Sequence, residues 1–556
     1  MKKLLFKLLA FALVIAMILP GAGAFADETG IKSEAWAKDP EKTYENYEGM
    51  TVILHSNDVH GSIEGYTYIK GLKKYYENMG AEVITVDAGD YLQGDPNVNL
   101  SKGKNAVTMM NAVGYDFVTL GNHEFDYGYA RQKKVLKKAN FTVLCADIFN
   151  SKGKTLYKAN AVWESKKSDL KIGFFGLDTP EAQTKANPAL IKGLKFVQGE
   201  ELYKVAQEQV DILSKKADIV IALTHLGVNA ESEPNTSYDL YKNTTGIDLI
   251  IDGHSHTVMT FGPNGEPIQS TGTKFQYVGM VMIDNATKEI VQRELITADR
   301  VTAGFDKAID KKVTKIVNKL NKKLDVVFAK SEVELFGLAR GDENTNGVRN
   351  SETNMGDLLT DALLWEATKE EGSISVDKDH IVCVTNGGGI REDIKIGDIT
   401  MRNIITVFPY SNTVSVIYLT GKDLLEALEA STFSTPGPVG GFPHVSGMKL
   451  TINTKKAFAQ GEQYPDSTYY APKKIKRVTI DSINGKKFNK NDTYAVVTND
   501  FLAGGGDTYY VFANATNKFD TGIVMNEAVV DYITNVLGGV IGSEYAEPQG
   551  RITIKK

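Results

Sequence analysis

Side chains that can bind metal ions gather in five short clusters of this 556-residue sequence. In chain order the clusters contain Asp58 and His60, then Asp90, then Asn122 and His123, then His225, and finally His254 and His256. Six of the eight histidines of the chain fall in or beside them, and none of the clusters contains cysteine. Nitrogen and oxygen ligands without a thiolate suit divalent zinc, manganese, iron or cobalt better than an iron–sulfur cluster.

Each cluster directly follows a short apolar run that is typical of a β-strand. The runs lie at 52–54, 83–86, 117–120, 219–224 and 247–251, with further runs at 141–145 and 171–177. Stretches with helical spacing, such as 68–79 and 130–138, separate them, and this alternation predicts a layered α/β domain. The carboxyl ends of strands in such a sheet converge on one crevice, so we expect the clusters to form one site. One cluster alone would more often be a turn with a surface histidine.

The second half of the chain has a different pattern, which predicts another domain. Residues 304–329 are rich in lysine, free of proline and amphipathic, so we expect a long connector helix there. From about residue 332 we expect a helix over 354–369, a buried strand over 381–385 and a hairpin turn at Asn484-Gly485. A chain of this length is too long for one hydrophobic core.

The amino terminus resembles a cleavable export signal. Three lysines precede an apolar run at 8–19, and Ala24-Phe25-Ala26 supplies a cleavage site, which predicts a signal peptide over 1–26 and a polar lead-in over 27–49. No integral membrane segment is expected after signal cleavage, and export to the surface, medium or periplasm is predicted. The two cysteines, Cys145 and Cys383, lie in apolar runs and are expected to be buried free thiols. The net charge of −6 argues against a nucleic acid polymer as partner.

Taken together, the five clusters resemble the signature of calcineurin-like metallophosphoesterases. The version in this chain is most similar to the 5′-nucleotidase family, which includes bacterial UDP-sugar hydrolases, and the resemblance runs from about residue 50 to the end. It implies a layered α/β/β/α metallophosphoesterase domain at 50–303, a connector helix at 304–331 and a C-terminal α/β substrate-binding domain at 332–556.

The resemblance also assigns roles to the clustered residues. It implies that Asp58, His60 and His256 hold one divalent metal ion, that Asn122, His225 and His254 hold a second, and that Asp90 bridges the two. Zinc, manganese or cobalt would fit. Two cations about 3.5–4 Å apart can activate water and neutralise phosphoryl oxygens. His123 is implied as a catalytic donor to the phosphoryl group, with Asp126 as its partner, whereas we interpret Glu124 as structural support.

Four motifs of the second half match the substrate-binding part of the family. The residues concerned are Arg349, Asn386, Arg391, Tyr410, Asn412, Phe501 and Asp507. Arginine suits phosphate through paired hydrogen bonds, and flat rings suit stacking on a nucleobase. By resemblance, Asp507 accepts from the ribose hydroxyls, and the two asparagines contact the nucleoside. Without the resemblance, surface ion pairs and core packing would explain these residues better. Thr345 replaces an arginine of some bacterial members, which puts activity on diphosphates in doubt.

These features predict an exported two-metal enzyme that releases phosphate from nucleoside 5′-monophosphates, with UDP-sugars or other nucleotides as possible further substrates. Rotation near residues 325–335 is expected to close the site. Two alternatives stay open within the enzyme class, a UDP-sugar hydrolase and a 2′,3′-cyclic nucleotide phosphodiesterase with 3′-nucleotidase activity. From another class, a nucleotide-binding surface protein without activity would require a missing ligand or a replaced His123, and the sequence contains neither.

Overall fold

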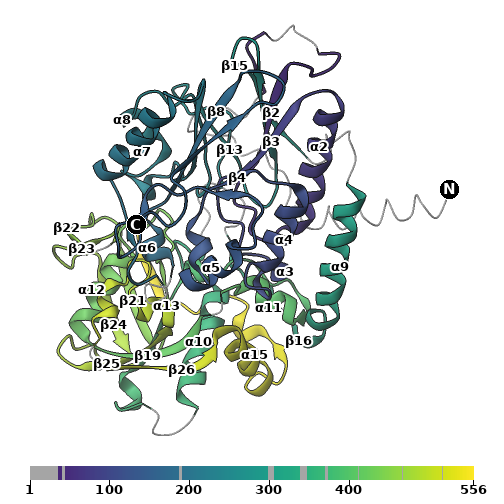
Figure 1. Ribbon diagram of the computed structural model, residues 1–556. Helices are drawn as coiled ribbons and strands as arrows, with labels where there is room; N and C mark the ends of the chain where they lie inside the picture. Colours follow the sequence, from purple (N-terminus) through teal and green to yellow (C-terminus); the bar gives the residue numbers. More distant parts are fainter. Residues whose placement is uncertain are drawn as a thin grey trace.

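The computed structural model describes residues 35–39, 44–186, 191–297, 306–338, 347–369, 374–410, 412–465, 467–515 and 517–556 (Figure 1). The predicted signal peptide, about half of the predicted lead-in and Thr345 lie outside these residues. Within the described ranges, no helix combines the length and apolar character needed to cross a membrane.

The first half of the chain contains two mixed sheets. One has the strand order β1 (Trp36–Ala37), β15 (Glu289–Ile296), β14 (Val278–Asp284), β2 (Met50–Ser56), β3 (Glu82–Asp87), β4 (Phe117–Val118) and β5 (Thr142–Val143). The other has the order β12 (Val258–Met259), β13 (Ile268–Thr271), β11 (Leu249–Ile251), β10 (Ile219–His225), β8 (Lys171–Asp178) and β7 (Asn160–Glu164). The expected strands therefore form.

The two sheets pack face to face, with helices outside each. Ile53 of β2 packs with Ile221 of β10 in the core between the sheets. Its neighbour Leu54 points to the opposite face, into a core shared with α2 (Tyr66–Asn78) and α4 (Lys104–Val113). The outer face of the second sheet is covered by α7 (Glu200–Leu213) and α8 (Ser237–Asn243). This is the predicted α/β/β/α order.

The strands that precede the metal-binding clusters run parallel to one another. In the first sheet β2, β3 and β4 are parallel neighbours, and in the second β8, β10 and β11 are parallel neighbours. Their carboxyl ends therefore lie at a common edge of each sheet, as the sequence pattern predicted.

The expected connector helix is shorter than predicted. It forms as α9 (Lys307–Leu324), capped by the side chain of Asp306, which accepts from two backbone N–H groups of the first turn. Ile309 and Val313 pack into the core that α9 shares with α2 and α4. Residues 327–331 form the strand β16 (Val327–Ser331), because they pair with β18 (Gly397–Thr400) and β27 (Val540–Ile541). Residues 304 and 305 lie outside the described part.

The second half is built on a five-stranded sheet. Its order is β20 (Pro443–Ser446), β17 (Ile381–Asn386), β25 (Thr493–Asn499), β19 (Thr413–Thr420) and β26 (Asn517–Val524). The helices α10 (Asn354–Thr368) and α15 (Met525–Asn535) contribute to the core on one face, and α12 (Gly421–Ser431) to the core on the other. A smaller sheet has the order β24 (Val478–Ile483), β21 (Met448–Asn453) and β28 (Ile552–Lys555).

Three smaller predictions for the fold are confirmed. The expected helix and buried strand of the second half correspond to α10 and β17. Asn484 and Gly485 both have positive φ values, 47° and 75°, and follow β24 in a tight turn. Cys145 and Cys383 are buried free thiols. The exact domain boundaries at 50, 304 and 332 stay predictions.

Candidate active site

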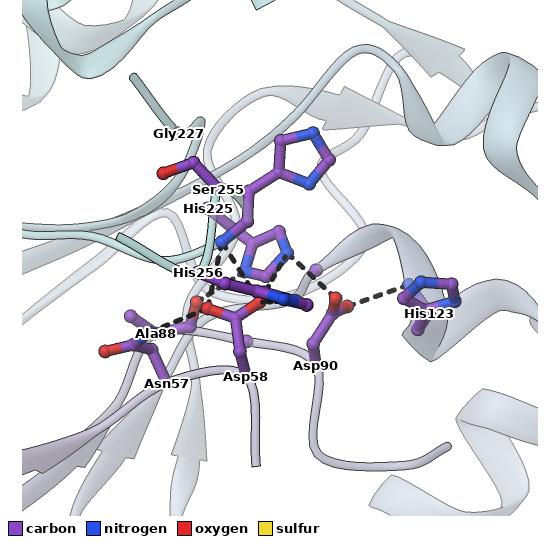
Figure 2. A network of polar contacts seen from close by, with 12 residues as sticks. Asn57, Asp58, Ala88, Asp90, His123, His225, Gly227, Ser255 and His256 are labelled. Atoms are coloured by element: carbon purple, nitrogen blue, oxygen red, sulfur yellow. Dashed lines mark hydrogen bonds and ion pairs between the residues drawn. The ribbon is translucent and has the colours of Figure 1, made fainter. Parts of the chain in front are cut away.

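The predicted metal ligands lie at or just after the carboxyl ends of the parallel strands, and Figure 2 shows four of them, Asp58, Asp90, His225 and His256. Asp58 and His60 follow β2, Asp90 follows β3, and Asn122 begins the short helix η2 (Asn122–Phe125) after β4. His225 ends β10, and His254 and His256 follow β11. Asp58, Asp90 and His225 are almost completely buried, so these three side chains have little access to water, whereas the side chain of His256 is partly exposed.

Two groups of side chains have the spacing of metal-ligand sets, and they share Asp58. In the first, Asp58, His60 and His256 bring one nitrogen or oxygen atom each within 4.8 Å of the others. In the second, Asp58, Asp90 and His225 do the same. The Nε2 atom of His225 is 3.2 Å from Asp90 Oδ2, and that of His60 is 3.7 Å from the same oxygen. Asp90 belongs to the second group and also lies near a histidine of the first.

The backbone at these residues adopts an unusual conformation. Asp58, His60, Asp90, His254 and His256 all have positive φ values, between 44° and 77°. A residue other than glycine in this left-handed region costs about 1–3 kcal/mol, and such residues cluster at functional sites. The same loops that bear the candidate ligands are therefore a strained part of the domain.

Hydrogen bonds fix the orientation of two of the candidate ligands. The Nδ1 atom of His225 lies 2.7 Å from the carbonyl oxygen of Ala88, so this nitrogen donates to the carbonyl and Nε2 faces Asp90 Oδ2 at 3.2 Å. The Nδ2 group of Asn57 donates to Asp58 Oδ2 at 2.7 Å, and its Oδ1 accepts from the backbone of Thr271. Both ligands are thus held by neighbouring groups that the sequence analysis did not single out.

The residues present fit divalent cations. Burial raises the pKa of Asp58 to about 7, despite the nearby imidazole of His225. The Nε2 atoms of His60 and His256 lie only 3.1 Å apart, close enough for both ring nitrogens to bind the same cation with Asp58. Among the described residues, the buried Oδ1 of Asn122 has no hydrogen-bond donor. A cation at this place would satisfy the amide oxygen, the carboxylates and the ring nitrogens together.

His254 has a different environment from the other candidate ligands. Its ring contacts Glu181, with Nε2 3.4 Å from Glu181 Oε2, while its backbone N–H donates to the Asp58 carboxylate at 3.0 Å. The ring centroid is 5.2 Å from that of His225. The structure therefore brings His254 to the cluster, but its imidazole is paired with a carboxylate that the sequence analysis did not consider.

Glu124 supports the loop that carries Asp90. Its carboxylate accepts hydrogen bonds from the backbone N–H groups of Asp90, Tyr91, Leu92 and Gly121, at 2.6–2.9 Å. Gly121 matters for a second reason, because a Cβ there would lie 2.4 Å from Asp90 Oδ1 and 2.7 Å from His225 Nε2. The interpretation of Glu124 as structural support agrees with these contacts.

Replacing Glu124 by glutamine is expected to weaken metal binding about 10–100-fold, as loss of an outer partner of a ligand commonly does. The amide of glutamine has one accepting atom and one donating group, so at least one of the four backbone donors loses its partner. We also expect unfolding to become easier by about 1–3 kcal/mol. Metal titration calorimetry and urea unfolding measure the two effects. The exposed Glu200→Gln is the control, and unchanged metal affinity in Glu124→Gln would contradict the prediction.

His123 and Asp126 form a largely buried pair beside the cluster. The Nδ1 atom of His123 is 2.8 Å from Asp126 Oδ2, and its backbone N–H donates to Asp90 Oδ1 at 2.9 Å. Burial lowers the pKa of His123, but the carboxylates of Asp126 and Asp90 outweigh it and raise that pKa overall. The pair is therefore suited to hold a positively charged imidazolium next to the candidate metal ligands.

The second half of the chain contacts this pair directly. The ring of Tyr410 is stacked on His123, with centroids 5.9 Å apart and planes at 22°. The guanidinium carbon of Arg391 lies 5.9 Å from the centroid of the same tyrosine ring. Asn99 of the first half donates to the carbonyl oxygen of Pro409 at 3.1 Å. The predicted nucleoside-binding loop therefore adjoins the predicted catalytic histidine.

The structure brings another pair of the predicted substrate residues together in the second half. Asn386 donates through Nδ2 to Asp507 Oδ2 at 2.7 Å, and Asp507 is buried with a φ of 49°. Phe501 is buried, and Asn412 is half-buried. Arg349 is exposed, and its charge lowers the pKa of His256, after the larger effects of burial and of Arg391.

The glycine run before Arg391 has a structural cause. A Cβ at Gly387 would lie 1.7 Å from the carbonyl oxygen of Val348, so only glycine allows the loop of Arg349 to pack here. The run therefore brings the main chain close to the loop that carries the other predicted phosphate-binding arginine.

Sequence reasoning missed three residues that contribute to the site. Asn57 orients Asp58, Glu181 contacts His254, and Lys185 lies 3.5 Å from Asp507. Glu181 and Lys185 follow the end of β8, a strand whose carboxyl end the sequence analysis did not use. The parallel arrangement of β8 beside β10 is the signal that could have drawn attention to them.

Comparisons with known proteins agree with this architecture. The calcineurin-like phosphoesterase model matches residues 51–258, and the 5′-nucleotidase C-terminal domain model matches residues 327–514. The chain is 30% identical, over 86% of its length, to the trifunctional nucleotide phosphoesterase protein YfkN of Bacillus subtilis, but spans only 33% of that protein. It is 27% identical to a 5′-nucleotidase of Vibrio cholerae, covering 90% of this chain and 92% of that one.

A solved structure has the same fold over nearly the whole chain. A 5′-nucleotidase precursor from Thermus thermophilus superposes with a TM-score of 0.73 at 25% identity, covering 91% of this chain and 99% of that one. The fold and the metal-binding clusters define a metal-dependent phosphoric monoester hydrolase with a calcineurin-like phosphoesterase domain. More narrowly, the chain belongs to the 5′-nucleotidase family.

Proposed function

We propose that this protein is an extracytoplasmic two-metal hydrolase that releases phosphate from nucleoside 5′-monophosphates. The observation that carries the proposal is the stacking of Tyr410 from the second half on His123 of the first. This contact places the ring of Tyr410, which is suited to stack on a nucleobase, next to His123, which is suited to donate to a phosphoryl oxygen. The names of the similar proteins, 5′-nucleotidase and nucleotide phosphoesterase, support the same substrate class, and the leader-like segment at 1–26 supports export.

In the proposed site, Asp58, His60 and His256 hold one cation and Asn122, His225 and His254 hold the other, with Asp90 shared. The distances between Asp90 and the two histidines on either side support the shared role of that carboxylate. When bound, two divalent cations would lower the pKa of a water molecule and neutralise phosphoryl oxygens. Zinc, manganese and cobalt all suit this ligand set.

His123 and Asp126 act on the phosphoryl group in this proposal. Asp126 accepts from His123 Nδ1 and stabilises the imidazolium, which leaves Nε2 as a donor. Negative charge builds on the phosphoryl oxygens in the transition state, so a charged donor at this place lowers the barrier. Arg391 and Arg349 add positive charge from the second half, and this charge, after burial, contributes to the lowered pKa of His256.

The nucleoside is proposed to bind in the second half, between Tyr410 and Phe501, with Asp507 at the ribose and Asn386 and Asn412 as polar contacts. Stacking tolerates different bases, so breadth toward the base is expected. Rotation of the halves near residues 325–335 would open this site. The end of α9 is the place for such a hinge, where Arg402 donates to Asp325 Oδ1 and Asn321 Oδ1 at 2.6 Å each.

Phosphate release by the purified mature protein tests the proposal. We expect metal-dependent release from 5′-AMP and little release from 3′-AMP, because only the 5′-ester places its phosphate at the cluster when the base is stacked on Tyr410. The same assay with 2′,3′-cyclic AMP, and with UDP-glucose plus an added phosphatase, defines the breadth. Chelation is expected to abolish activity, and zinc, manganese or cobalt to restore it. Preference for 3′-AMP and the cyclic ester would overturn the substrate assignment and keep the metal chemistry.

A further inference from the structure

A lysine of the metal-bearing half reaches the predicted ribose site of the other half. Lys185 ends the short helix α6 (Ala182–Lys185), which follows β8. Its Nζ atom is 3.5 Å from Oδ1 of Asp507, and the side chains of both residues are largely buried. The two halves therefore meet at an ion pair on the carboxylate that is proposed to bind the ribose hydroxyls.

Contacts from both halves hold this ammonium in place. Glu181, at the start of α6, lies with Oε2 3.8 Å from Lys185 Nζ and 3.4 Å from His254 Nε2. The ring of Tyr469, in the second half, lies 5.6 Å from the same Nζ, a distance that suits a cation–π contact. Lys185 therefore contacts the nucleoside-binding half directly, and Glu181 links it to His254, a candidate metal ligand.

Neighbouring groups surround the ion pair closely. Gly440 lies against it, and a Cβ on that glycine would lie 3.3 Å from Lys185 Nζ and 3.4 Å from Asp507 Oδ1. The other carboxylate oxygen of Asp507 accepts from Asn386. A ribose that binds Asp507 through its two hydroxyls must therefore meet Lys185 at one of them.

We propose that Lys185 is a specificity-determining residue that recognises the 2′,3′-hydroxyl edge of the ribose together with Asp507. This inference rests on the proposed nucleotide substrate. A hydroxyl both donates and accepts, so one hydroxyl can donate to Asp507 while its oxygen accepts from the Lys185 ammonium. A sugar without these hydroxyls makes neither of these hydrogen bonds, and a site built to bind a hydroxyl discriminates strongly against an analogue that lacks it. Because Lys185 belongs to the metal-bearing half, ribose recognition is complete only when the halves are together.

Binding of adenosine and of 2′,3′-dideoxyadenosine to the metal-loaded full chain tests the inference without turnover. Isothermal titration calorimetry gives the ratio of the two affinities for the wild type and for Lys185→Met. We expect the wild type to prefer adenosine. In the variant, the ratio of the two affinities should fall about tenfold, because a paired polar group is removed from a discriminating site. The same ratio is measured as kcat/KM for the two 5′-monophosphates. The matched control is Lys195→Met, whose ammonium pairs with the exposed Glu201, and urea unfolding verifies that both variants fold.

The outcomes separate the two proposals. An adenosine preference that is the same in Lys185→Met as in the wild type overturns the role of Lys185 and leaves the proposed function standing. A preference that falls in Lys185→Met, with no hydrolysis of 5′-AMP by the wild type, supports Lys185 and overturns the 5′-monophosphate substrate. A wild type that neither binds adenosine nor discriminates between the two monophosphates overturns the inference.

Discussion

Replacing Asp90 by asparagine is expected to lower kcat more than about 100-fold and to reduce metal content. Loss of an outer partner of a metal ligand already costs about 10–100-fold, and Asp90 lies close to a histidine of each candidate ligand group. The asparagine keeps an oxygen that accepts from the backbone N–H of His123, so the local shape is retained while the negative charge is lost.

Phosphate release and metal content by mass spectrometry, measured on the same preparation, check this prediction. The exposed Asp169→Asn is the control, because its carboxylate pairs with Lys288 at the surface and lies outside the cluster. Loss of activity together with loss of metal is the expected result. An Asp90→Asn protein that keeps both metals and full activity would show that the carboxylate does not hold them.

Replacing His123 by alanine is expected to lower kcat by about 10²–10⁴-fold while the metal content is unchanged. The imidazole lies beside the candidate ligands, and the hydrogen bond from His123 to Asp90 comes from the backbone N–H, which alanine retains. Asp126→Asn should cause a smaller loss, because the imidazole stays but its positive charge is no longer stabilised by the carboxylate.

His380→Ala provides a matched control, because His380 also pairs with an aspartate, at 2.6 Å from Asp379, but belongs to the second half. Steady-state kinetics with 5′-AMP and metal analysis give the comparison. If His123→Ala loses metal in proportion to activity, His123 supports the metal site and does not act on the phosphoryl group.

The candidate ligands could be placed from the sequence because strand order decides where they lie. Asp58, Asp90 and His225 each follow or end a buried apolar run, and parallel pairing brings the ends of such runs to one edge. The α/β/β/α layers follow from the same alternation, since Ile53 and Leu54 must enter different cores. These features depend on local patterns that a single sequence contains.

Other features could not be predicted because they depend on how distant segments meet. The pairing of His254 with Glu181 depends on side-chain rotamers, and the contact of Lys185 with Asp507 depends on how the two halves are placed. The connector helix was predicted too long because pairing with β18 and β27, which lie far along the chain, decides that residues 327–331 form a strand.

The left-handed backbone at the site has a consequence for how this protein can change. Asp58, His60, Asp90, His254 and His256 all occupy a region that glycine adopts without cost. A lineage that no longer needed catalysis would gain folding stability by drifting to glycine at these residues, whereas selection for turnover keeps the strained side chains. Efforts to make the enzyme more heat-resistant should therefore leave these loops alone and seek stability elsewhere, since stabilising them and preserving activity are opposed aims.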